Sequence, residues 1–147
     1  CNQLVVDLPR MIDRTAIAVL QQAAKIIVVV QQDYINLKDA VHLLDILRNE
    51  LAILDDQIVI AINRYDKKSA IRLQDIQESL KPKTMVTIPN DYKVVFDSLN
   101  KGEPINSIAR RSPIAKAIDE IQSGLINDDL GPQRGVFSNL FSRLTGG

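Results

Sequence analysis

Four short runs of apolar, largely β-branched residues recur along the chain, and each of them ends in polar residues. The runs cover residues 4–6, 26–30, 58–62 and 84–88. Apolar runs of this length without alternation are typical of strands in a parallel sheet that helices cover on both faces. We therefore expect parallel strands whose polar ends gather along one edge of the sheet.

The segments between these runs carry the spacing of amphipathic helices. Apolar residues recur at intervals of roughly three and four on two of them, the first with Ile12, Ala16, Val19 and Ala23 and the second with Leu37, Val41, Leu44 and Leu51. Alternation of strand and helix predicts right-handed crossovers and a three-layer α/β domain with a parallel sheet. Ligands bind outside the carboxyl ends of such strands, so we expect a ligand site at the polar edge.

Two further helices are predicted after the last strand. Asn90 is a candidate amino-terminal cap for the first of them, and Gly102 supplies its stop signal. Ser112 is the candidate cap of the second, with Pro113 in its first turn. Asp13, Asp33 and Asn36 are weaker candidate caps for the earlier helices.

The composition indicates one globular domain. The chain has 147 residues, of which 46% are hydrophobic, its formal net charge is zero, and no segment is long and apolar enough to span a membrane. Its Lys and Arg residues are scattered and it has no Trp, so we expect no nucleic-acid surface. A single Cys1 excludes an internal disulfide, and with one His it argues against a zinc site. A reducing cytoplasm is the default compartment.

The start of the chain leads us to expect a fragment. It has no initiator Met and enters an apolar run almost at once. Neighbouring strands of the sheet would then be missing.

Four motifs in order carry a resemblance to a known family: LVVDLPR, IIVVVQQD, IVIAINRYD and TIPNDYKVVFDSLNKGEPI. Over residues 3–125 the chain resembles the C-terminal half of the deviant-Walker ATPases of the MinD/ParA class, and within it most resembles the CpaE/TadZ pilus assembly proteins. The resemblance implies a P-loop NTPase-like fold without its N-terminal strands and phosphate loop. Residues 1–126 would form this half-domain, and 127–147 a tail.

The resemblance implies a metal-directed and a phosphate-directed group of residues. Asp7 would be the Walker B carboxylate, which positions Mg²⁺ through a bound water. Gln31 and Asp33 would lie near the phosphates or on a dimer face.

It also implies an adenine pocket. Asn63 would bind the adenine edge with its amide, which offers a donor and an acceptor together. Arg64 would flank the base with its planar guanidinium, and Pro89, Asn90 and Asp91 would form the pocket wall. Structural roles stay open for these residues: Asp7 and Asn63 could be turn residues, Arg64 a surface residue, and Asn90 a helix cap.

No G-x-x-x-x-G-K-[ST] pattern occurs in the chain, so it lacks the loop that would cradle phosphates. We therefore expect that it does not hydrolyse ATP by itself. No G-x-G-x-x-G follows any predicted strand, which argues against dinucleotide chemistry.

For the whole protein, the resemblance implies a nucleotide-dependent dimeric switch that localises Flp-type pilus assembly at the inner-membrane face or cell pole. Its partners would be a second copy, the assembly ATPase and inner-membrane platform proteins. One alternative is a localisation scaffold that keeps the fold without turnover. A weaker alternative is a chromosome or plasmid partition ATPase, which should have a basic surface for DNA.

The tail carries an apolar stripe of its own, made by Val136, Phe137, Leu140, Phe141 and Leu144. With Arg143 as the single cation inside the stripe, docking on protein is favoured over contact with an anionic membrane, and a disordered tail is the next alternative.

Overall fold

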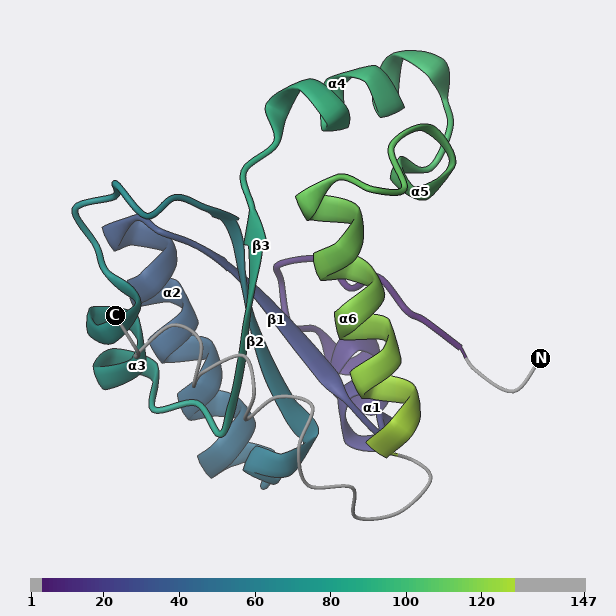
Figure 1. Ribbon diagram of the computed structural model, residues 1–147. Coiled ribbons are helices and arrows are strands. Elements are labelled where there is room, and N and C mark those ends of the chain that lie inside the picture. Colours follow the sequence, from purple (N-terminus) through teal and green to yellow (C-terminus); the bar gives the residue numbers. More distant parts are fainter. Residues whose placement is uncertain (1–3, 129–147) are drawn as a thin grey trace.

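The computed structural model describes residues 4–128, and within them a parallel sheet of three strands lies in the order β1, β2, β3 (Figure 1). β1 spans Ile26–Gln31, β2 spans Ile58–Tyr65 and β3 spans Thr84–Pro89. The β-branched runs at 26–30, 58–62 and 84–88 are thus confirmed as strands of one parallel sheet.

Helices alternate with the strands, as predicted. They are α1 (Arg14–Gln22), α2 (Tyr34–Asp45), α3 (Leu73–Leu80), α4 (Tyr92–Lys101), α5 (Ile105–Ile108) and α6 (Pro113–Asp128). A π-helical turn (Ile46–Glu50) continues α2, and a short 3₁₀ turn (Asp55–Gln57) leads into β2. Asp13 and Asp33 cap α1 and α2, and the Ser112 hydroxyl accepts a hydrogen bond from the Ala115 amide at the start of α6, as expected for these three residues.

The helices form layers on the two faces of the sheet. α2 and α3 lie side by side on one face, and α6 crosses the other (Figure 1). The larger core cluster joins the sheet to α2 and α3, and the smaller one joins Val59, Ala61 and Val86 to Ile121 and Leu125 of α6. The three-layer α/β architecture is confirmed, and residues 58–62 of β2 are buried on both faces.

β1 departs from the expectation that helices cover both faces of each strand. Its residues alternate between buried and exposed, and Ile27 and Val29 are 42% and 59% exposed. The smaller core cluster shows the reason, because its buried residues lie on β2 and β3 where α6 packs. Within the described residues, β1 is therefore an edge strand with one open face.

The strand predicted at residues 4–6 is not present. Leu4 and Val5 are 88% and 94% exposed, and the segment has no regular secondary structure. A strand needs a neighbour for its backbone N–H and C=O groups, and within residues 4–128 no strand pairs with this segment. Partial packing of Leu8 on the larger cluster and the exposed Arg10–Asp39 ion pair (2.9 Å) connect it to the domain.

The buried face of α2 is also shifted from the predicted stripe. Val41 is 44% exposed, whereas Ala40 and Leu44 are buried, together with Leu47 in the π-helical turn. Ala40, Leu44 and Leu47 keep intervals of four and three, so the helical period is as predicted, and the buried stripe is displaced by one position, from Val41 to Ala40.

The predicted tail begins inside α6, which continues through Asn127 to Asp128. Its apolar stripe (Val136, Phe137, Leu140, Phe141 and Leu144) lies outside the described residues. Among residues 4–128, none of the helices has the length and apolar character needed to cross a membrane.

Candidate functional site

The end of β2 has an unusual backbone. The pairing register with β3 shifts between Ile62 and Tyr65, and Arg64 adopts a left-handed conformation with φ of 54°. For a residue with a Cβ this conformation costs about 1 kcal/mol and persists only where neighbouring contacts hold it. The amide of Arg64 donates to Oδ1 of half-buried Asn63 at 3.0 Å. This bond fixes the direction of the Asn63 side chain.

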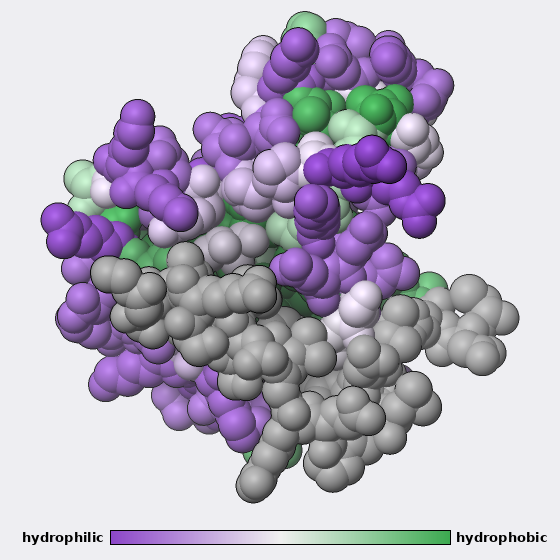
Figure 2. Space-filling view, in the orientation of Figure 1, coloured by the Kyte–Doolittle hydropathy of each residue, from purple (hydrophilic) through white to green (hydrophobic). Residues whose placement is uncertain are grey.

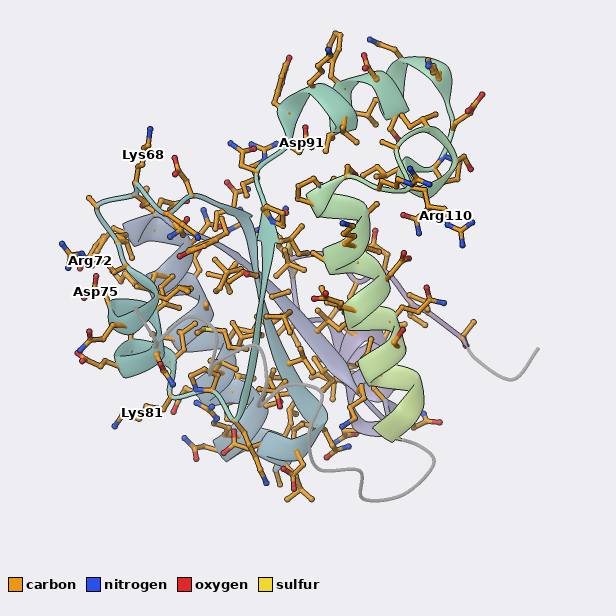
Figure 3. The ribbon with its side chains drawn as sticks, viewed as in Figure 1. Lys68, Arg72, Asp75, Lys81, Asp91 and Arg110 are labelled. Carbon is orange, nitrogen blue, oxygen red and sulfur yellow. The ribbon has the colours of Figure 1, made fainter. Side chains whose placement is uncertain are left out.

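The end of β3 lies directly beside this turn. Pro89 is paired with Tyr65, and the amide of Asn90 donates to the Tyr65 carbonyl at 3.2 Å. Asp91 caps α4, because its Oδ1 accepts from the Val94 amide at 3.2 Å. The cap was predicted at Asn90, and this is corrected to Asp91, whose carboxylate stands three residues before Val94 and reaches its amide. Figure 3 shows Asp91 at the junction of β3 and α4.

The two strand ends bring together the residues of the predicted adenine pocket: Asn63, Arg64, Pro89, Asn90 and Asp91. One carboxylate oxygen of Asp91 is engaged by its capping bond. The amide nitrogen of Asn63, by contrast, has no hydrogen-bond partner among the described residues. The Asn63 side chain therefore offers an N–H donor to a ligand, while the Arg64 amide holds its carboxamide oxygen in place.

The end of β1 lies next to the end of β2, since Gln31 is paired with Asn63. Asp33 accepts hydrogen bonds from the Asn36 amide at 2.8 Å and from the Asn36 side chain at 2.6 Å. The backbone bond from Asn36, followed by its side-chain bond, lowers the pKa of the Asp33 carboxyl. Asp33 is thus a helix cap, and contact of Gln31 or Asp33 with phosphates stays a prediction.

Gln32 is a residue of this edge that the sequence analysis did not single out. Its side chain bonds to Asp66 and Ile71 in the loop that follows β2. These partners are 34 and 39 residues away, so no local pattern in the sequence signals the contact.

Asp7 does not stand at the end of a strand. It is exposed in the irregular segment before α1, and the described residues contain no cluster of three or more acidic, His or Cys side chains able to hold a metal ion. A magnesium site needs at least one oriented carboxylate beside substrate phosphates. The residues described here do not form such a site by themselves, and the role of Asp7 stays a prediction.

The loop after β2 is basic. It carries Lys67, Lys68 and Arg72 and follows Arg64 of β2, and none of these four side chains forms an ion pair within the described part of the chain. Figure 3 shows Lys68 directed away from the sheet, and hydrophilic side chains cover this end in Figure 2. These cations are close together in the sequence, and Arg64 is the one that lies among the residues of the predicted pocket.

α4 and α5 project beyond this edge (Figure 1). α4 buries none of its residues, and its Tyr92 and Leu99 are each 74% exposed. The rings of Tyr92 and Phe96 stack at 5.6 Å. In Figure 2 hydrophobic side chains are visible on this projection, below its hydrophilic crest.

A surface pocket lies at the opposite, amino-terminal edge of the sheet. It is lined by residues from β2, β3, α6 and the adjoining loops: Lys25, Asp56, Val59, Lys83, Thr84, Gly124 and Leu125. It is far from the polar strand ends, where the chemistry was predicted. We give more weight to the strand ends, because the lysines of this pocket already bond to Asp56.

Among solved structures, the chain matches the crystal structure of a ParA family ATPase from Chlorobium tepidum TLS, with a TM-score of 0.62 and 24% sequence identity. The match covers 72% of this chain and 43% of that one, so the chain spans less than half the length of its structural relative. No protein family and no curated protein matches the sequence. The three parallel strands and their helices thus have the fold of part of a ParA-like P-loop NTPase.

Proposed function

We propose that the chain forms the adenine-side half of the ATP site in a ParA-like ATPase. The observation that carries this proposal is the grouping of Asn63, Arg64 and Asn90 at two neighbouring strand ends, with the Asn63 amide nitrogen unpartnered among the described residues. Ligands of open parallel sheets bind at this edge.

The recognition chemistry follows from the side chains. Adenine presents an amino donor next to a ring-nitrogen acceptor, and an Asn amide complements both. The bond from the Arg64 amide leaves one lone pair on Asn63 Oδ1 and fixes the orientation of the group. The Arg64 guanidinium is exposed and planar, which suits it to stack on the base.

The phosphates need contacts that these residues do not provide. The chain has no G-x-x-x-x-G-K-[ST] pattern, and that loop would supply the amides and the lysine that bind the β and γ phosphates. Mg²⁺, where bound, supplies charge neutralisation at those phosphates. We assign no step of hydrolysis to this chain.

At the level of the whole protein, we propose a nucleotide-dependent dimeric switch in Flp-type pilus assembly, related to CpaE/TadZ and acting at the inner-membrane face or cell pole. The motifs DLPR, NRYD, IPNDY and SPIAKAI support this choice, because together they resemble the CpaE/TadZ proteins more than cell-division MinD. The partners would be a second copy, the assembly ATPase and the membrane platform.

The alternative of a localisation scaffold without turnover is favoured by α4. Its exposed Tyr92, Phe96 and Leu99 make an apolar stripe that protein binding would cover and that nucleotide turnover does not require. The partition ATPase is disfavoured by the composition, but the cations of the loop after β2 form no ion pairs within the described residues, and contacts with DNA phosphates need such cations.

The proposal is tested by NMR titration of the 147-residue chain with ATP. We expect binding on the order of 1 mM, with signal changes at Asn63, Arg64 and Asn90. Asn63→Ala should weaken it about tenfold, because it removes two hydrogen bonds to the base. Asn49→Ala is the matched control, since Asn49 bonds to Asp45 at the other end of the sheet. Equal affinity of wild type and Asn63→Ala would contradict the proposal.

Calorimetry with Mg-ATP on the longer protein, beside this chain, separates the switch from the scaffold. Tight binding by the longer protein alone supports an adenine-side half that needs a phosphate loop. Absence of binding by either moves the assignment to the scaffold.

A further inference from the structure

Gln32 connects the end of β1 to both ends of the loop that follows β2. Its Nε2 donates to the Ile71 carbonyl at 3.0 Å, and its Oε1 accepts from the Asp66 amide at 2.6 Å. Gln32 is half-buried and lies between β1 and α2. Both ends of its carboxamide are therefore used in one long-range contact.

The loop between these two contacts has hydrogen bonds of its own. Asp66 Oδ1 accepts from the Lys68 amide at 2.8 Å, and the Asp66 carbonyl accepts from the Ser69 amide at 3.1 Å. The Ile71 amide donates to Ser69 Oγ at 3.3 Å. The loop is thus a defined turn, and Gln32 fixes that turn to the sheet.

This turn directly adjoins the candidate pocket. Asp66 directly follows Tyr65, and the left-handed Arg64 stands between the regular part of β2 and these two residues. Asn90 holds Tyr65 from the β3 side, and Gln32 holds Asp66 from the β1 side. A left-handed non-glycine residue within a strand persists only when the surrounding contacts hold it. Without Gln32, one of these contacts is lost.

We propose that Gln32 is the positioning residue for base recognition by Asn63: through the Asp66 amide it holds Arg64 left-handed, and so keeps the Asn63 amide in the orientation that distinguishes adenine from guanine. The proposal rests on the proposed function. Adenine offers a donor beside an acceptor, whereas the corresponding edge of guanine offers two acceptors. An Asn amide free to rotate would accept either base.

The chain provides a matched control in Gln57, at the opposite edge of the sheet. Gln57 Nε2 donates to the Ala23 carbonyl at 3.1 Å, and its Oε1 accepts from the Leu54 amide at 3.2 Å. Gln57→Ala therefore removes the same two kinds of hydrogen bond as Gln32→Ala, but away from Asn63.

The experiment is an NMR titration of wild type, Gln32→Ala and Gln57→Ala with adenosine and, separately, guanosine. We expect Gln32→Ala to lower the adenosine affinity about threefold to tenfold and to bring the adenosine-to-guanosine preference close to one. Gln57→Ala should keep the preference of wild type. Folding of each variant is verified from amide exchange, which should accelerate at Asp66 in Gln32→Ala and at Leu54 in Gln57→Ala.

Gln32→Glu separates the two halves of the contact. Its carboxylate can still accept from the Asp66 amide but cannot donate to the Ile71 carbonyl, so we expect it to retain most of the base preference. An unchanged preference in Gln32→Ala, or the same loss in Gln57→Ala, would overturn the positioning role while adenosine still binds. A wild-type chain whose Asn63 signals do not respond to adenosine overturns the proposed function itself, and the positioning role with it.

Discussion

The two ends of the parallel sheet use their polar groups in different ways. At the amino-terminal edge, Lys83 pairs with Asp56, and Lys25 donates to the Asp56 carbonyl at 2.9 Å. At the carboxyl-terminal edge, the Asn63 amide nitrogen and the Lys68 side chain have no partner within residues 4–128. One edge thus satisfies its polar groups internally, whereas the other keeps them available for a ligand.

Each edge also has a left-handed residue, and the two residues differ in their structural setting. Lys81 is left-handed at the end of α3, where a helix commonly ends in that conformation, and Arg48 binds the Lys81 carbonyl at 3.2 Å. Arg64 is left-handed at the end of β2, at the point where the pairing register with β3 shifts. Strain without a role in ending a helix is found most often at functional sites.

A charge placed in the core between α2 and the sheet should unfold the domain, and with it both edges of the sheet. Leu44→Asp places a charge in the cluster between α2 and the sheet, where Leu44 is 1% exposed, and we expect a loss of about 4 kcal/mol or more in the free energy of unfolding. Val41→Asp, one turn earlier on an exposed position, should cost less than about 1 kcal/mol. Urea denaturation followed by circular dichroism measures both, and equal losses would show that the buried face of α2 is misassigned.

Arg48→Met should weaken the amino-terminal edge alone. The guanidinium of Arg48 bonds to Asp55 at 2.7 Å and to the carbonyls of Leu80 and Lys81. Losing these contacts should lower the free energy of unfolding by about 1–2 kcal/mol, because two terminal carbonyls of α3 lose their donor. The affinity for adenosine should not change, and a parallel loss of affinity would show that the two edges are coupled.

Glycine in place of Arg64 or Lys81, two of the three non-glycine residues with positive φ in the described chain, sharpens the comparison. Arg64→Gly and Lys81→Gly should each leave stability unchanged or raise it by up to about 1 kcal/mol, because glycine adopts positive φ without strain. Only Arg64→Gly should weaken adenosine binding, by about threefold, since a guanidinium stacked on a base contributes ~0.5–1 kcal/mol. Thermal denaturation measures the change in stability, and NMR titration measures the change in adenosine affinity. Loss of binding in Lys81→Gly would argue against a site confined to the carboxyl-terminal edge.

The smallest expected effect concerns pH. The pKa of Asp33 is lowered by its bonds from Asn36, so its contribution to stability is present above the carboxyl's unfolded pKa and is lost as the pH falls through the folded value. Asp33→Asn keeps an oxygen acceptor for the cap but does not titrate. Wild type should therefore lose stability relative to this variant below about pH 4, as measured by urea denaturation at several pH values. A difference that stays constant in acid would contradict the capping role.

Much of the fold could be predicted because its signals are local. The β-branched runs at 26–30, 58–62 and 84–88 are strands because such residues pack well in a buried sheet, and Asp13, Asp33 and Ser112 cap helices whose amides lie three residues away. The grouping of Asn63 and Asn90 at one edge of the sheet could also be predicted. Parallel strands place their carboxyl ends at one edge, which follows from topology alone.

The errors arise where structure depends on distant partners. Residues 4–6 have the composition of a strand, but composition does not supply the neighbour that a strand requires. The exposure of Ile27 and Val29 follows from where α6 packs, which is decided by residues nearly a hundred positions later. Gln32 reads as an ordinary polar residue after a strand, and its two loop contacts become visible only in three dimensions.

The open side of β1 has a consequence for handling the protein. Within the described residues β1 is hydrogen-bonded to β2 on one side, and its other side presents backbone donors and acceptors beside the apolar Ile27 and Val29. Such an edge is a template for pairing with the same edge of another molecule. With a formal net charge of zero, the chain has no electrostatic repulsion to oppose this association. The six-residue strand β1 therefore offers one route by which the chain would self-associate in concentrated solution.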